Sequence, residues 1–354
     1  MKKWLMFFIL LLSFCSAAHA KSPLNLIITV KTSPQSELAS TLRIQNGLAE
    51  RILASKTAPG HQKPDLIRAT LTVGNRQYDF DSYSQLYERA THKKILLSVQ
   101  THTELEKCVG ILESSHYGKA LSWEQIRKEF RRMSYARVVD METGKSFEIQ
   151  RRAGSRHADV QPVTLQDTKI MKDIYKGKWS WRRRAIVVLI DGKRYAASMN
   201  GMPHGAGAIR GNGFRGHFCI HFKDSSTHRR SKPDPSHHLM ILKASGQLRK
   251  TIMNADPHRL IDYFLIALNE HDATTLALTM EGALPFPPEK ISFLKKQESK
   301  GAGGLTDHLT AEIPVKLSYI KEGEGKKNEV WTFLLRRASP LERWTIVKVD
   351  VRKK

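Results

Sequence analysis

The sequence predicts an α+β fold, in which a mostly antiparallel β domain with a short helix is followed by a helix packed on a curved sheet. Two turn signals, Met141–Gly144 and Asp191-Gly192, each separate two apolar runs and predict hairpins in the β domain. Closer to the C-terminus, an apolar helix face over residues 260–268 precedes three long strand-like runs, at 311–320, 329–337 and 344–351. The 354 residues suffice for two or three domains.

Residues 21–132 form the first predicted segment, an α+β region without a motif that indicates a particular chemistry. Leu66–Val73 and Arg76–Phe80 flank a two-residue turn and predict a hairpin. Ile95–Val99 is predicted as a further strand, and Trp123–Phe130 as a short amphipathic helix.

Residues 133–250 form the second predicted segment, the β-rich domain with the two hairpins. Thr164 and Asp167 have the spacing of a capping box, with Asp in place of Glu, and predict the start of a short helix. After the second hairpin the chain enters a glycine-rich loop that contains His204, and it then forms the apolar run Phe218–Phe222, which we predict as a strand.

Residues 251–354 form the third predicted segment. Asp256 is a candidate N-cap, and Pro257 suits the first position of the helix. The helix is followed by long strands that end in a Trp-x-Ile-x-x-Val pattern from Trp344 to Val349, and this order resembles the NTF2-like α+β cone. Because such domains often act as accessory binding modules, the resemblance implies that the active site lies elsewhere.

The first twenty residues predict export. Lys2-Lys3 is a positive n-region, Trp4–Cys15 is an apolar core of signal-peptide length, and Ala18-His19-Ala20 is an A-x-A cleavage site. We expect cleavage after Ala20, so that residues 1–20 are a signal peptide and the mature protein is secreted and associated with the cell wall. No later run is apolar enough to cross a bilayer, so we expect membrane contact only through the signal peptide.

The charge balance predicts an anionic partner. The formal net charge is +24 and the pI is about 10.0. For an exported protein this favours peptidoglycan or another anionic wall polymer, or lipid headgroups, and the alternative is that the charge serves only solubility. The sequence has no motif typical of nucleic-acid binding. Residues 201–250 hold nine Lys or Arg against two acids, and within this basic stretch Arg215 and His228 are candidate substrate-binding residues.

The mature chain keeps two cysteines, Cys108 and Cys219. Two cysteines do not make a disulfide scaffold, but they leave two alternatives open. Either the two thiols form one bridge, which would remove any thiol chemistry, or Cys108 is a small core residue and Cys219 is free.

The surroundings of Cys219 contain the most informative motif. His217, Cys219 and His221 alternate along a predicted strand, so their side chains share one face. A further imidazole, His204, lies in the glycine-rich loop upstream. A thiol beside a base becomes a strong nucleophile, whereas thiolate and imidazole together are also zinc ligands.

The motif resembles the L,D-transpeptidase (YkuD-type) signature, an upstream His-Gly followed by Ser/Thr-His-Gly-Cys. His204 and Gly205 match the upstream pair, and Gly216-His217-Phe218-Cys219 matches the second part, with Gly216 for Ser/Thr and Phe218 for Gly. His221 stands where the family has Arg or Asn. The resemblance implies acyl transfer on peptidoglycan stems without a cofactor.

The same resemblance implies roles for single residues. Cys219 is the expected nucleophile and His217 the expected general base, while His204 orients His217 or binds substrate. Gly205, Gly216 and His221 are further candidate substrate-binding residues.

Two other interpretations use the same residues. Ser155–Asp159 faintly resembles the ligand motif of zinc D,D-peptidases of the VanY type, so a zinc-dependent peptidase would hold its ion with His157, Asp159, His217 and His221. In the second, a basic wall-binding protein without catalysis would use the histidines only as surface or core residues. Trp179 and Trp181 either line a sugar-binding groove or fasten the helix to the sheet.

Overall fold

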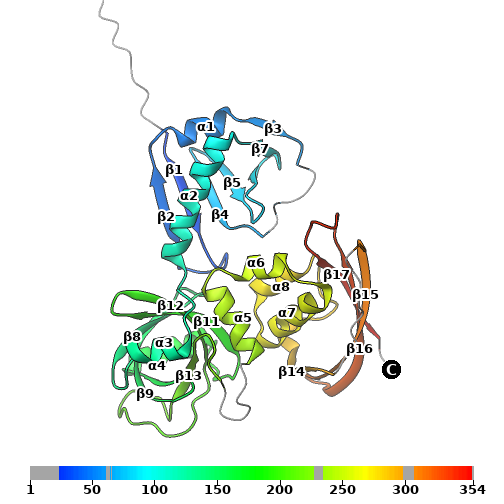
Figure 1. Ribbon diagram of the computed structural model, residues 1–354. Coiled ribbons are helices and arrows are strands. Elements are labelled where there is room, and N and C mark those ends of the chain that lie inside the picture. The colour runs from blue at the N-terminus through cyan, green and yellow to red at the C-terminus, as the bar shows by residue number, and fades with distance from the viewer. Residues whose placement is uncertain (1–23, 61–63, 65, 227–233, 298–306, 353–354) are drawn as a thin grey trace, which may run out of the picture.

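The computed structural model describes residues 24–60, 64, 66–226, 234–297 and 307–352. The predicted signal peptide and the candidate residue His228 lie outside the described residues. The described chain is an α+β fold with mostly antiparallel sheets, as the sequence predicts (Figure 1). No helix in the described ranges is long and apolar enough to span a membrane.

An antiparallel sheet of seven short strands forms the N-terminal part, and helices α1 (Leu48–Ala54) and α2 (Val99–His116) pack with it. The hairpin predicted around Gly74 is confirmed. The strand predicted over Ile95–Val99 ends at Leu96, because the hydroxyl of Ser98 accepts the N–H of Thr101 and begins α2. In sheet order, the strands are β2 (Ser40–Ile44), β1 (Leu26–Val30), β4 (Ala69–Val73), β5 (Arg76–Phe80), β6 (Leu86–Glu88), β7 (Lys94–Leu96) and β3 (Lys56–Ala58).

The central part is a closed antiparallel barrel of six strands. Both predicted hairpins are confirmed. Asp191 and Gly192 both have positive φ, 47° and 74°, as a type I′ turn requires. In barrel order, the strands are β10 (Ala158–Pro162), β13 (Phe218–His221), β12 (Lys193–Asn200), β11 (Arg183–Ile190), β8 (Tyr135–Asp140) and β9 (Ser146–Ala153).

Two helices complete the barrel. The capping box predicted at Thr164 and Asp167 is present and begins α4 (Leu165–Ile174). Helix α3 (Trp123–Glu129) belongs to the first predicted segment, yet its buried side chains join the barrel core, where the Trp123 ring stacks on Phe222 at 6.0 Å. The barrel unit thus begins before residue 133.

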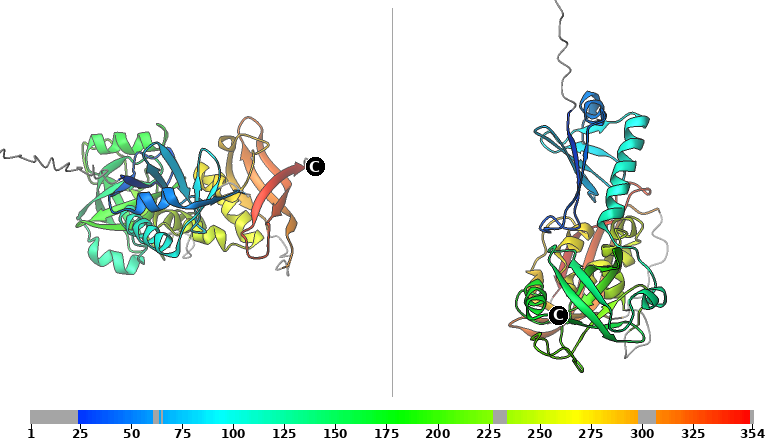
Figure 2. Two further views of the ribbon diagram at one scale, coloured as in Figure 1. Left: turned by 90° about the horizontal axis from the view of Figure 1, so that it is seen from above. Right: turned by 90° about the vertical axis from the view of Figure 1, so that its left-hand side faces the viewer.

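Helices α5 (Pro235–Ala244), α6 (Leu248–Met253), α7 (Pro257–Glu270) and α8 (Ala273–Thr279) lie between the barrel and a C-terminal sheet (Figures 1 and 2). Asp256 caps α7 by accepting the N–H groups of His258 and Arg259, as predicted. The sheet has one strand more than the three predicted, because β14 mixes apolar and polar residues without regular alternation. The strands are β14 (Ile291–Lys296), β15 (Thr310–Lys321), β16 (Gly325–Arg336) and β17 (Thr345–Arg352).

Two hydrophobic cores hold this arrangement. One fills the barrel and includes the inward side chains Phe218 and Ile220 of β13. The other runs continuously from the N-terminal sheet through α2 and α5–α8 to the C-terminal sheet. The outer surface of β13 therefore belongs to neither core, and the candidate site lies there.

Candidate active site

The pairing of β13 determines which side chains surround Cys219. Phe218 and Ile220 point into the barrel, so Cys219 and His221 point to its outer side. Asp159 on β10 lies directly opposite Cys219, and its Oδ1 atom is 3.9 Å from Sγ. Neighbouring strands thus place a carboxylate beside the thiol, on the same face of the sheet.

The imidazole of His204, in the glycine-rich loop before β13, lies close to the sulfur of Cys219. His204 and His217 form an isolated bridge with backbone N–O distances of 3.0 and 2.8 Å. The Nδ1 atom of His204 donates to the carbonyl of Met202 at 2.8 Å, and its Nε2 atom lies 3.3 Å from Sγ of Cys219. Because a carbonyl oxygen only accepts, the neutral ring carries its proton on Nδ1 and its lone pair faces the thiol.

His217 lies beside this pair without bonding to the sulfur. Its Nδ1 donates to the carbonyl of Ala206 at 3.0 Å, and its Nε2 lies 3.8 Å from Oδ1 of Asp159. The geometry therefore favours an exchange of the two roles expected from the sequence. His204 has the position of the general base, and His217 supports its backbone and ring, with ring centroids 4.5 Å apart.

The two candidate glycines allow the loops to meet. Gly216 has φ 93°, and a Cβ atom there would lie 2.4 Å from the carbonyl oxygen of His204. At Gly205, with φ 60°, a Cβ atom would lie 2.5 Å from the ring of His217. Any side chain at either position would displace a histidine. Gly205 and Gly216 thus allow the two loops to approach each other. Arg215, by contrast, is exposed and can meet a substrate.

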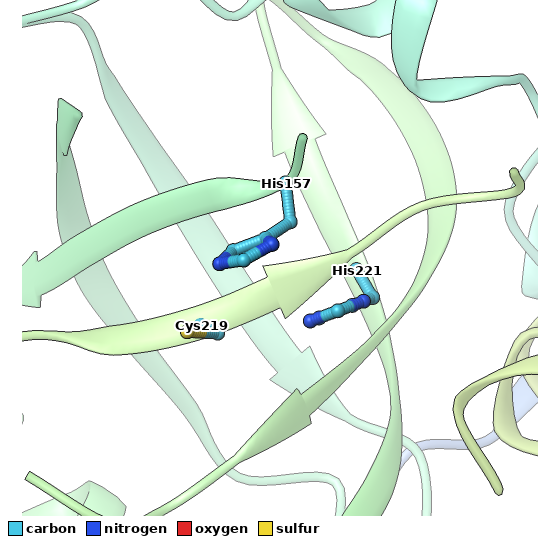
Figure 3. Close-up of side chains that lie close together, drawn as sticks. All are labelled: His157, Cys219 and His221. Carbon is cyan, nitrogen blue, oxygen red and sulfur yellow. The ribbon is translucent and has the colours of Figure 1, made fainter. Parts of the chain in front are cut away.

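Two further histidines, His157 and His221, are buried and lie close to Cys219 (Figure 3). We call the side of Cys219 toward these two residues its inner side, and the side toward His204 and His217 its outer side. His157 donates from Nδ1 to the carbonyl of Ser226 at 3.0 Å, and its Nε2 lies 3.2 Å from Oδ1 of Asp159. His221 stacks between the rings of His157 and His237, at centroid distances of 4.5 and 3.7 Å. His221 is only 3% exposed, so its ring is covered by protein in this structure.

These neighbours shift the ionisation of the thiol. Burial raises the pKa of Cys219, but hydrogen bonds with His157 and His204 outweigh burial and lower that pKa below its ordinary value. The bond to Cys219 raises the pKa of His204. Burial opposes the charged form of His157, yet Asp159 and Cys219 raise its pKa to about 10. A lowered thiol pKa beside histidines of raised pKa favours transfer of the Cys219 proton to a neighbouring imidazole.

The sequence left a disulfide open, but both cysteines are free thiols. Cys108 lies on α2 and packs against the core that runs from the N-terminal to the C-terminal sheet. Burial there raises the pKa of its thiol. Of the two thiols, Cys219 is the one that lies beside imidazoles able to act as a base.

Two nearby tryptophans differ in role. Trp179 packs edge-on against Phe214 beside the barrel core, at 5.2 Å. Trp181 is 48% exposed, and its ring lies 4.9 Å from that of His204. Trp179 thus fits the packing alternative, and Trp181 is the tryptophan that a substrate can reach.

The basic stretch is less uniform than its composition suggests. Lys243 is only 4% exposed and forms 2.6 Å ion pairs with Glu142 and Asp272, so it holds α5 in place and does not face an anionic partner. The structure also brings His237 of α5 to this site. Its Nδ1 bonds Oγ of Ser198 at 2.8 Å.

Two overlapping groups have donors suited to a metal ion, His157/Cys219/His221 and His204/His217/Cys219. In each group the ligand atoms lie within 4.8 Å of one another. The four residues expected as zinc ligands thus surround the thiol, and Cys219 joins them. No family model and no curated protein matches this chain, so its function is inferred from this geometry.

Proposed function

We propose that this protein is an exported enzyme that acts on peptidoglycan stem peptides by cysteine-dependent acyl transfer, in the manner of an L,D-transpeptidase. The observation that carries the proposal is the 3.3 Å contact between Nε2 of His204 and Sγ of Cys219. It combines a thiol of lowered pKa with a base on the half-exposed side of the strand.

The proposed reaction has two steps, acylation and deacylation of Cys219. The Cys219 thiolate attacks a peptide carbonyl carbon, and the C–N bond breaks as His204 gives its proton to the leaving amine. The product is a thioester on Cys219. An acceptor amine, or water, then attacks the thioester, His204 takes a proton from it, and the thiolate leaves. No cofactor is needed.

The remaining features suit a wall substrate. Arg215 and Trp181 are exposed near the site and offer a cation and an aromatic surface to a peptide or sugar. The net charge of +24 favours binding to an anionic wall polymer in an extracytoplasmic location. The C-terminal helices and four-stranded sheet would be an NTF2-like accessory module.

A zinc-dependent peptidoglycan peptidase is the second candidate, and the donor groups around Cys219 favour it. Here His157, Asp159, His217 and His221 would hold the ion, and the ion would activate a water. A wall-binding protein without catalysis is the third, and it would tolerate replacement of Cys219.

The test is intact-mass analysis of residues 21–354 incubated with peptidoglycan stem peptides and a chelator. We expect a thioester adduct on Cys219 that an added amine releases as a new peptide bond. Cys108→Ser should form the same adduct, and Cys219→Ser should form none. Cleavage by Cys219→Ser that stops with chelator would support the metallopeptidase instead, and wall binding without turnover would support the third candidate.

A further inference from the structure

The inner side of Cys219 has a second set of donors that the proposed reaction does not require. His157, Cys219 and His221 each offer one ligand atom, and these atoms lie within 4.8 Å of one another (Figure 3). None of the three residues is more than 5% exposed. A thiol and two imidazoles enclosed in this way form a compact group of donors for a small ion.

The orientation of the His157 ring suits this purpose. Its Nδ1 donates to the carbonyl of Ser226, so Nε2 is the ring nitrogen that faces the cluster, and a bound ion would replace the proton that Nε2 shares with Asp159. A hydrogen bond from the second ring nitrogen to a carbonyl is the usual support of a metal-binding histidine.

His221 is also prepared as a ligand. Its ring is fixed between His157 and His237 by stacking, and His237 is itself held by Ser198. The Nδ1 atom of His221 is buried and has no hydrogen-bond partner among the described residues.

Asp159 adds a carboxylate beside two of the three donors. Its Oδ1 atom lies 3.2 Å from Nε2 of His157 and 3.9 Å from Sγ of Cys219. One sulfur, two imidazole nitrogens and one carboxylate oxygen are a donor set for a tetrahedral zinc ion.

We propose that the inner side of Cys219 binds a divalent cation of the zinc class through Cys219, His157 and His221, with Asp159 as the fourth ligand. The bound ion would engage the sulfur electron pair that attacks the substrate. The metal-loaded protein would therefore be a resting form with a masked thiol. This consequence rests on the proposed function, whereas the binding itself does not.

Cobalt(II) is a suitable probe, because a cobalt–thiolate bond gives a charge-transfer absorption that reports sulfur ligation. Residues 21–354 are stripped with a chelator, titrated with Co²⁺, and then competed with Zn²⁺. We expect one equivalent bound, with a charge-transfer band that Zn²⁺ removes. His221→Asn and His157→Asn should weaken binding by more than the roughly 10–100-fold that loss of a second-shell partner costs.

Two control variants locate the ion. His237→Phe keeps a flat ring against His221, and His204→Ala removes only an outer imidazole, so both should retain the band. Circular dichroism checks that each variant is folded. Wild-type protein without the band, a folded His221→Asn with unchanged affinity, or loss of the band in His204→Ala alone would overturn the proposal.

The two proposals fail separately. If the stripped protein forms the acyl adduct on Cys219 but binds no cobalt, only the metal site is refuted. If cobalt binds with the band but the stripped protein forms no adduct, the acyl-transfer function is refuted and the metal site stands.

Discussion

The two sides of Cys219 carry the same kind of residue under different conditions. On the outer side, His204 and His217 are half-exposed and held by loop carbonyls, Met202 and Ala206. On the inner side, His157 and His221 are almost fully buried.

The comparison shows that neighbours, more than residue type, determine what an imidazole does. Two adjacent buried rings, His157 and His221, have opposite shifts. Asp159 and Cys219 raise the pKa of His157 to about 10, while burial keeps His221 neutral. On the outer side, Nε2 of His204 is thus placed for proton transfer. On the inner side, the positive charge of His157 is held away from water.

Replacement of the shared atom should have the largest effect. Cys219→Ser removes the nucleophile that histidines on both sides contact. We expect acyl transfer to fall by about 10³-fold or more. Cys108→Ser should retain full activity, because Cys108 lies on α2 in the other core. Adduct formation by mass spectrometry measures both, and an active Cys219→Ser protein would remove Cys219 from the chemistry.

Loss of the outer base should have the next largest effect. His204→Ala removes the hydrogen bond to Sγ, so we expect a rate loss of roughly 10²–10⁴-fold. The pKa of Cys219 should also rise, since that bond helps to lower it. His217→Ala should cost less. If His217→Ala instead shows the greater loss in a full pH–rate profile, His217 is the base and the exchanged roles are refuted.

Asp159→Asn tests the charge held on the inner side. The pKa of His157 is about 10 in the folded protein against 6.5 ordinarily, so its contribution to stability is complete below pH 6.5 and is lost as the pH rises through 10. We expect Asp159→Asn to lose about 1–3 kcal/mol of unfolding free energy near pH 6, with a smaller loss above pH 10.

Denaturant unfolding at the two pH values measures this difference. Asp173→Asn is the matched control, because Asp173 pairs with Lys145 at the surface and is 63% exposed. That variant should stay close to wild type at both values. A loss in Asp159→Asn that does not depend on pH would mean that His157 carries no proton in the folded protein.

The replacement with the smallest expected effect, His157→Gln, distinguishes most clearly between the inner and the outer histidines. His157→Gln should raise the pKa of Cys219 but leave His204 in place, so activity at pH 7 should fall by about tenfold for each unit of the rise. Above the new thiol pKa the rate should return to the wild-type value. His204→Ala should show no such recovery, and recovery in both variants would mean that the two histidines act alike.

Local patterns predicted much of the fold. Short-range geometry determines the hairpin turn at Asp191-Gly192, the capping box at Thr164 and the cap at Asp256, and all three are present. Strands without such signals were missed. β10 is buried but contains polar residues, and in β14 apolar and polar residues do not alternate regularly, so neither shows the expected pattern.

The site was predicted in part for the same reason. Alternation along one strand placed Cys219 and His221 on one face, and the motif pointed to His204. His237 was missed because it comes from α5, across a contact that no sequence spacing reveals. The pairing of Asp159 with Cys219 likewise depends on the register between two strands far apart in the chain.

The sequence by itself determined the elements with local signals, the positive charge and the residues able to do chemistry near Cys219, because these depend on composition and on neighbours along the chain. Only the tertiary structure decided that His204 meets the sulfur, that His221 is buried beneath it, and that both thiols are free. Those facts depend on barrel closure, strand register and the approach of one loop to another at Gly205 and Gly216, which set distances between residues that the chain keeps far apart.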